Sequence, residues 1–353
     1  MFEIITLDRL VYWDKIVKSF SQYDIYYLSG YVKAFEIHGD GIPLLLYYQK
    51  DNLRGISVMM KRDISSDNHF NGLLPEDSLY DIVTPYGYGG FIFEGNTSTE
   101  NIIEFDRLFA ELLNSKNIIS VFYRFHPQLN NADVLRSVID VIDLGKTVEI
   151  DLQSMETIWS DFTSKNRNTI RKSEKKGVVI KNGQDKALFD QFIEIYNHTM
   201  DNDNADLYYY FDENFYKSIQ SYLQDNYEMF YAEFDGKIIA MSIILFANKR
   251  MHYHLSGQVF EYRNFAATNL LLYKAACWGV EKGFKKFHLG GGVGSGEDGL
   301  FKFKKAFNRY KYNQFSIGKK IYNQEKYDFL VSLRNRNDLN FDINSSFFPL
   351  YRA

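Results

Sequence analysis

Short apolar runs and their spacing predict a mixed α and β protein. Two apolar runs, Ile42–Gln49 and Gly55–Lys61, are separated by a polar turn, which is typical of a β-hairpin. Two further runs, Glu228–Phe234 and Lys237–Phe246, flank the dipeptide Asp235-Gly236. Asp-Gly is one of the strongest short signals for a tight hairpin turn. Each half of the chain therefore contains one predicted hairpin.

The same order of elements follows both hairpins. In the first half, helical spacing over Thr99–Ser115 precedes a strand over Ile118–Phe125. In the second half, a strand over Met251–Gly257 precedes a helix over Ala266–Lys282 and a strand over Lys286–Leu289. The repeated order predicts an internal duplication of one supersecondary plan.

The duplication predicts an α+β protein of two modules, each a mixed, mostly antiparallel sheet flanked by helices. A length of 353 residues is also typical of two domains. We expect an N-terminal module over residues 1–150 and a C-terminal module over residues 151–330 that opens with a basic linking helix, 154–176. The aromatic end of the chain predicts that a tail, 331–353, docks on the core.

Composition limits the possible functions. The net charge is -4, so any anion-binding site must come from a local patch rather than from the whole protein. The single cysteine, Cys277, excludes a disulfide within the chain and is expected to pack inside a helix. No run approaches the roughly 20 apolar residues of a membrane helix, and the N-terminus lacks a signal-peptide pattern. We therefore expect a cytoplasmic protein.

The densest positive charge lies between Lys165 and Lys176, a segment with six basic residues and one acidic residue. Arg167 and Arg171 are four positions apart and share one side of a helix. Paired guanidinium groups match the geometry of phosphate, so the pattern predicts a phosphate clamp. A solvated basic helix face is the alternative.

A glycine-rich loop, Gly290–Gly299, follows the last predicted strand and precedes the basic-aromatic segment Phe301–Lys305. A strand end beside a helix N-terminus commonly forms a ligand crevice. In acyl transfer, Lys304 could stabilise an oxyanion or a leaving group together with backbone N–H groups of the loop. The alternative is an ordinary surface lysine. The pattern GxGxxG at Gly294–Gly299 is not expected to be a dinucleotide site, because no acidic residue occurs over 315–320.

The stretch Asp81–Gly90 is dense in glycine and tyrosine. A carboxylate or phenol in a half-buried groove can take a proton, which makes Asp81 and Tyr86 candidates beside turn-forming roles. Tyr88 belongs to the same run and is a candidate for gripping a partly polar substrate. His252 and His254 alternate on a strand without a third ligand, so no metal site is expected.

These segments resemble a known family. Asn166–Lys172, Leu270–Gly291, Gly299–Phe307 and the run Tyr86–Gly90 are similar to Fem-type proteins, the methicillin-resistance-factor family of peptidoglycan-bridge aminoacyltransferases. Their two modules are tandem GNAT (Gcn5-related N-acetyltransferase) folds. The resemblance implies transfer of an acyl group from a thioester or an aminoacyl-tRNA ester to an amine. In the bridge-forming enzymes the acceptor is a nucleotide- or lipid-linked cell-wall precursor.

The resemblance also implies roles for individual residues. Lys304 stands at the position of the family's Phe-Lys lysine, which resembles a catalytic position. Arg167 or Arg171 would lie near the acceptor's phosphates, and Lys33 corresponds to an early phosphate-contacting lysine of some members. Arg263 begins the stretch that matches the pyrophosphate loop of GNAT enzymes, although Ala266 replaces the loop's first glycine.

Together these observations predict an N-acyltransferase that uses acyl-CoA or aminoacyl-tRNA as co-substrate and binds no cofactor tightly. Its acceptor would be an amine of a cell-wall or sugar precursor, carried on a small molecule, a lipid or a nucleotide. No DNA partner and no transmembrane segment are expected. The alternative is a non-catalytic module that holds a nucleotide-sugar or an RNA end, with tyrosines stacked on bases.

Overall fold

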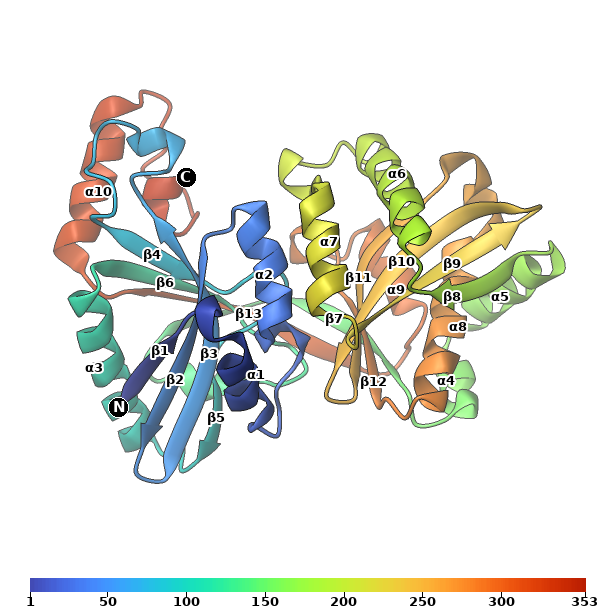
Figure 1. Cartoon of the computed structure of the whole chain (residues 1–353), viewed down its shortest axis with the longest axis horizontal. Helices are drawn as coiled ribbons and strands as arrows, with labels where there is room; N and C mark the ends of the chain where they lie inside the picture. Colours follow the sequence, from blue (N-terminus) through green and yellow to red (C-terminus); the bar gives the residue numbers. More distant parts are fainter. The chain divides into compact units, whose positions relative to one another are not determined.

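A computed structural model describes all 353 residues, and the chain forms two compact units. The first unit comprises Met1–Leu144 and Phe315–Ala353, and the second comprises Gly145–Gln314 (Figure 1). Strand β7 (Asp140–Asp151) leads from the first unit into the second, and β13 (Tyr312–Ile321) leads back. None of the helices combines the length and the apolar character needed to cross a membrane.

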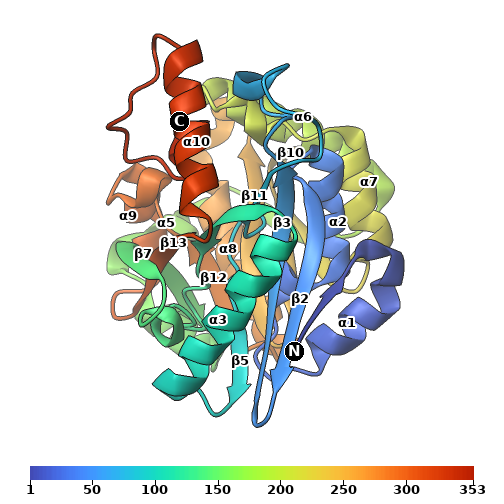
Figure 2. The ribbon, with the colours of Figure 1, turned by 90° about the vertical axis from the view of Figure 1, so that its left-hand side faces the viewer.

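The sheet of the first unit has the order β1-β2-β3-β4-β6-β13, with β5 paired to β3. Only β4 and β6 are parallel neighbours. Helix α3 crosses one face of this sheet, and α1 and α2 cover the other (Figure 2). The bounds are β1 Phe2–Ile5, α1 Leu10–Lys18, α2 Ser29–His38, β2 Ile42–Lys50, β3 Leu53–Asp63, β4 Tyr80–Val83, β5 Ile92–Gly95, α3 Thr99–Ser115, β6 Ile118–Arg124 and α10 Gln324–Asn337.

The sheet of the second unit has the order β8-β9-β10-β11-β12-β7, and only β11 and β12 are parallel. Helices α6 and α7 lie on one face and α8 lies on the other (Figure 1). The bounds are α4 Met155–Asp161, α5 Ser164–Lys175, β8 Val179–Gly183, α6 Lys186–Asn202, α7 Glu213–Tyr222, β9 Tyr227–Phe234, β10 Lys237–Ala247, β11 Arg250–Gln258, α8 Ala267–Glu281, β12 Lys286–Gly290 and α9 Gly299–Lys305.

The two units share one plan, so the predicted duplication and fold class are confirmed. In the first unit β1, α1 and α2 are followed by the antiparallel strands β2, β3 and β4, and α3 leads to the parallel strand β6. In the second unit, after β7, α4 and α5, the same order runs from β8, α6 and α7 through β9, β10 and β11 to α8 and the parallel strand β12. In each, a further strand pairs antiparallel with that parallel strand, β13 with β6 and β7 with β12. The two crossover helices, α3 and α8, begin and end within one residue of their predicted limits.

Helix α8 packs unusually close to the sheet. Its buried residues include Leu270, Leu271 and Ala275, which join the core formed with β10, β11 and β12. A Cβ atom on Gly279 would lie 2.5 Å from the Met251 sulfur, so a larger residue would have to displace the Met251 side chain. This contact brings the C-terminal part of α8 close to β11.

The parallel pair β11–β12 separates along its length. Cα pairing runs from Arg250↔Lys286 to His252↔His288 and then stops, while β11 continues to Gln258. A β-bulge at His254 falls just beyond this point, because Ile243 of β10 pairs with Leu255 while the next residue pairs with Tyr253. Bulges bend strands and often lie next to functional sites.

The linking segment differs from the prediction. A single helix over 154–176 was expected, but α4 ends at Asp161 and α5 begins at Ser164. Phe162 is extended, and the Thr163 hydroxyl accepts a hydrogen bond from the Asn166 amide at 3.2 Å, which caps α5. A local cap therefore overrides the continuous helical pattern.

The two compact units divide the chain at 144/145 and 314/315, whereas the sequence suggested modules of 1–150 and 151–330. The residues after 314 contribute most of β13 and all of α10 to the first unit. At the end of the chain, Tyr351 is fully buried and packs with Phe70 and Tyr327.

Candidate active site

Lys304 lies where β11 and β12 separate. Its Nζ donates a hydrogen bond to the Gly291 carbonyl at 2.7 Å and lies 6.0 Å from the centre of the Tyr253 ring. Tyr253 follows the last residue of β11 that pairs with β12, and Gly291 follows the end of β12. The amine is therefore positioned between the diverging ends of the two parallel strands.

Lys304 is also the one lysine of α9 that is withdrawn from water. It is 8% exposed, whereas Lys302 and Lys305 are exposed. Burial lowers the pKa of Lys304 to about 8, and the Asp298 carboxylate acts in the opposite direction. A buried lysine with a shifted pKa at the end of a strand is a candidate functional group.

Asp298 organises the glycine-rich loop around this lysine. Its carboxylate accepts hydrogen bonds from the Val293 amide at 3.1 Å and from the Phe301 amide at 2.8 Å. It therefore closes the loop and caps α9 at once. Because α9 has only seven residues, the loop does not open the long helix of a dinucleotide site, in agreement with the sequence analysis.

The N-terminus of α8 carries no acidic side chain. Ala266 occupies the cap position in the left-handed conformation, with φ of 51°, and no side chain caps the helix. Arg263 precedes it, with its guanidinium 3.9 Å from the centre of the Phe260 ring. The Lys176 amine donates to the Asn264 carbonyl at 2.7 Å, which places a second cation at this end of the helix.

Arg167 and Arg171 both lie close to Trp159, but only Arg167 is held by hydrogen bonds to backbone carbonyls. The Arg167 guanidinium donates to the carbonyls of Trp159 and Phe162 at 3.1 and 2.9 Å, so it caps the C-terminal end of α4. Arg171 is exposed, lies 5.1 Å from the Trp159 ring centre and reaches Asn168 at 3.3 Å. No hydrogen bond joins either arginine to Lys304, and the phosphate clamp stays a prediction.

Asp81 is held by cations in the first unit. Its two oxygens accept from Arg62 Nε and Arg352 Nε, each at 2.6 Å, and from the Tyr351 hydroxyl at 3.0 Å. Burial raises the pKa of Asp81, but the charges of Arg62 and Arg352 outweigh burial and hold the pKa below its usual value. Such a carboxylate is a poor base at neutral pH.

Tyr86 and Tyr88 lie in an aromatic cluster of the first unit. Tyr86 stacks on Phe35 of α2 at 5.3 Å, and its carbonyl accepts from the Tyr31 hydroxyl at 2.7 Å. Tyr88 is close to Tyr26, and burial raises its pKa. Lys33 is half-buried on the same helix, α2, where its amine pairs with Glu36 at 2.8 Å.

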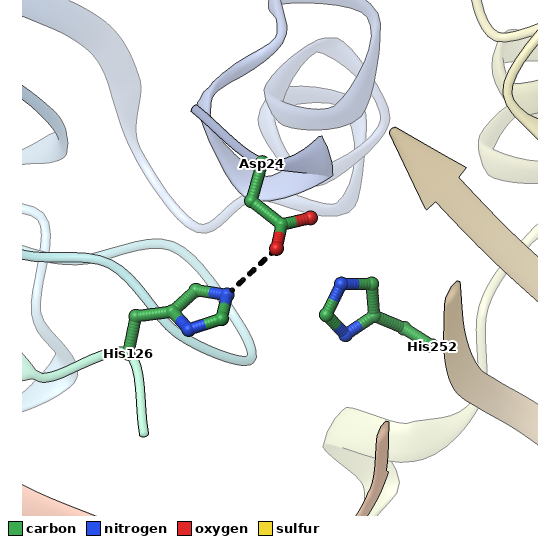
Figure 3. A group of neighbouring side chains, drawn as sticks. All are labelled: Asp24, His126 and His252. Carbon is green, nitrogen blue, oxygen red and sulfur yellow. Dashed lines mark hydrogen bonds and ion pairs between the residues drawn. The ribbon is translucent and has the colours of Figure 1, made fainter. Parts of the chain in front are cut away.

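Sequence reasoning missed a buried Asp–His pair in the first unit. Asp24 Oδ2 lies 3.0 Å from His126 Nε2, and both side chains are fully buried (Figure 3). Asp24 also caps a short helical turn through the Ile25 amide, and the His126 amide donates to the Gly89 carbonyl at 3.1 Å. A carboxylate that orients an imidazole can help it carry a proton. The partners are 102 residues apart, and only the predicted strand end before His126 gave a signal.

Comparison with known proteins gives a family match within the second unit. Residues 161–311 match the family model described as an acetyltransferase (GNAT) domain. This part of the chain is similar to GNAT acetyltransferase domains. The matched range contains α5, α8, the glycine-rich loop and Lys304, so the candidate site lies within it.

Solved structures extend the similarity to most of the chain. FemX is 14% identical, with a TM-score of 0.67, over 93% of this chain and 99% of FemX. The C-terminal domain of a proposed lysylphosphatidylglycerol synthetase from Agrobacterium fabrum is 14% identical, with a TM-score of 0.56, over 91% of this chain and 92% of that one. A tandem GNAT protein from the clavulanic acid biosynthesis pathway is 8% identical, with a TM-score of 0.50, over 91% and 99%.

At these identities the similarity shows the fold. The resemblance to Fem-like tandem GNAT proteins that the sequence suggested is confirmed at this level. A comparison with curated protein sequences gives no match.

Proposed function

We propose that the protein is an N-acyltransferase whose donor binds to the second unit, between the N-terminus of α8 and the separation of β11 and β12. The observation that carries this proposal is the position of the Lys304 amine, 2.7 Å from the Gly291 carbonyl at the opening between the parallel strands. The match of this unit to GNAT acetyltransferases supports it.

The two duplicated helices differ at their N-termini, which favours the second unit for an anionic donor. In α3, Ser98 caps the helix and Glu100 lies in the first turn, where backbone and Ser98 hydrogen bonds lower the pKa of Glu100. That helix end therefore already holds a carboxylate. Helix α8 has neither feature, and Arg263 and Lys176 lie beside it. Free N–H groups and nearby cations suit the phosphates of CoA.

In the proposed reaction, a neutral acceptor amine attacks the carbonyl carbon of the donor thioester. The C–N bond forms, the C–S bond breaks, and the thiolate that leaves takes up the proton released by the amine. Negative charge develops on the carbonyl oxygen. The Lys304 ammonium would donate a hydrogen bond to that oxygen, and a fixed donor of this kind acts strongly in a buried site.

We propose an acceptor amine carried on a phosphate-bearing cell-wall, lipid or sugar precursor. Of the two arginines of the predicted phosphate clamp, Arg171 is exposed and available to a phosphate. Arg167 is hydrogen-bonded to the backbone of α4. Lys33 stays a candidate for phosphate binding in the first unit, and Tyr88 for contact with the substrate. Tyr86 stays a candidate for passing the proton of the amine on to the thiolate, whereas Asp81 is already bound by two arginines.

An aminoacyl-tRNA ester is the second candidate donor. The observation that favours it is the structural similarity to FemX and to a lysylphosphatidylglycerol synthetase, whose name implies an aminoacyl group on a phospholipid. With this donor the same carbonyl chemistry applies, and the leaving group is the ribose hydroxyl.

Direct transfer assays distinguish these possibilities. The full chain is incubated with radiolabelled acetyl-CoA or aminoacyl-tRNA and a panel of amines, after a thermal-shift screen against CoA and UDP-sugars. We expect CoA to raise the melting temperature and label to pass to an amine. Transfer from aminoacyl-tRNA but not from acetyl-CoA would mean that aminoacyl-tRNA, and not acyl-CoA, is the donor. Binding without transfer from either donor would support a non-catalytic binding module instead.

A further inference from the structure

We propose that Lys304 is itself a site of acylation, and that it takes the acyl group from a bound thioester when no acceptor amine is present. The inference rests on the proposed function, because the donor must reach the opening between β11 and β12. It adds a modification site to that function. It also implies that the protein would inactivate itself when no acceptor is present.

The location of the amine is the first argument. Tyr253 and Gly291 mark the diverging ends of the two strands, and the Lys304 Nζ is near both, at 6.0 Å from the ring centre and 2.7 Å from the carbonyl. An acyl group that enters this opening from the N-terminal side of α8 would meet the Lys304 amine. The same proximity that allows an ammonium to stabilise the oxyanion allows a neutral amine to attack the carbon.

The surroundings of Lys304 supply that neutral amine. The side chain is 8% exposed, and the Asp298 carboxylate is too weak an influence to offset the loss of hydration. With a pKa of about 8, an appreciable fraction of the amine is neutral near pH 7.5. Lys302 and Lys305 share the helix but are exposed, so water solvates their charge. Among the lysines of α9, Lys304 is therefore the one expected to be acylated.

The site also accommodates the product. An acylated lysine retains one N–H, which can continue to donate to the Gly291 carbonyl, so this acceptor does not lose its partner. The amide is neutral, so its burial lacks the desolvation cost of a buried ammonium. The neighbouring Phe301 is buried in the core of the unit and offers an apolar environment to a short acyl chain.

The step is balanced without any further reagent. The nitrogen lone pair of Lys304 attacks the thioester carbon, the C–N bond forms and the C–S bond breaks. The proton lost from nitrogen goes to the departing thiolate, which leaves as free CoA. The amide is stable, so the modified protein would lack the ammonium that the proposed reaction needs and would stop turning over.

The test uses the full chain and acetyl-CoA without an acceptor. We expect the intact mass to increase by one acetyl group, and peptide mapping to locate the group on Lys304. Lys304→Arg should lose this modification, while Lys302→Arg, the matched control on the exposed side of α9, should retain it. Protein unfolded in urea should lose the preference for Lys304, because the preference depends on the folded site.

The outcomes separate the two proposals. A mass increase that persists in Lys304→Arg, or that maps to exposed lysines, would overturn the inference. Transfer to an added amine without modification of Lys304 would overturn it alone and leave the proposed function standing. Absence of modification, of transfer and of any CoA-dependent thermal shift would overturn both.

Discussion

At the residue scale, the proposed chemistry depends on the charge of Lys304. If this ammonium stabilises the oxyanion, turnover should be high below the pKa of about 8 and should fall as pH rises through that value, because the charge is lost. A lysine that acted as a base would give the opposite slope. The measurement is the pH profile of kcat, and Lys304→Arg, which keeps its charge, should lack the fall near pH 8.

Asp81 is expected to stabilise the first unit. Replacing it by Asn leaves Arg62 and Arg352 facing a neutral group, and breaking a buried ion pair typically costs about 3–5 kcal/mol. Urea unfolding measures this loss. A fall in turnover with unchanged stability would instead assign Asp81 a catalytic role.

The same carboxylate predicts acid sensitivity. Its folded pKa lies below the unfolded value, so its contribution is present above the unfolded pKa and is lost as pH falls through the folded pKa. Stability should therefore drop at pH values below about 4. Asp81→Asn should flatten this part of the stability profile.

At the element scale, the residue that caps the N-terminus of α8 has a strained backbone conformation. Ala266 has φ of 51°, a conformation that costs a residue with a Cβ roughly 1 kcal/mol and glycine almost nothing. Ala266→Gly should therefore raise the free energy of unfolding by up to about 1 kcal/mol. Ala267→Gly, one residue later in the helix, should lower it by about as much. Equal effects of the two changes would contradict this account.

The two arginines of α5 should separate in their effects. Arg167 donates to carbonyls at the end of α4, so Arg167→Ala should reduce stability by about 1–3 kcal/mol. Arg171 is exposed, so Arg171→Ala should leave stability almost unchanged. If it contacts the acceptor's phosphate, its loss should raise KM for the acceptor several-fold with kcat retained. An unchanged KM would remove Arg171 from the acceptor site.

The sequence predicted elements better than it predicted contacts. Helices α3 and α8 have strong apolar periodicity, and the Asp235-Gly236 turn fixes its hairpin, so local patterns were sufficient. The break between α4 and α5 depends on one capping threonine within a continuous basic pattern. The cationic partners of Asp81 could not be predicted, because Arg352 is 271 residues away in sequence.

At the scale of the whole molecule, one plan occurs twice, but the two copies differ in chemistry. The N-terminus of α3 already holds a carboxylate, whereas that of α8 has nearby cations and an amine at the strand opening. Sequence identity to solved relatives is 14% or less for the three similar structures, so shared topology does not determine the substrate. The surroundings of Lys304 could be predicted from sequence, because the strand end, the glycine-rich loop and the lysine lie in one continuous segment.

Comparison of the full chain with Lys304→Met and Lys302→Met tests the central claim most directly. The measurement is the rate of acyl transfer to the preferred amine at saturating acetyl-CoA, with donor affinity followed by thermal shift. We predict that Lys302→Met retains the rate, while Lys304→Met binds CoA but loses about 10²–10³ in rate, as expected for a lost oxyanion donor. Equal rates for the two variants would contradict the account.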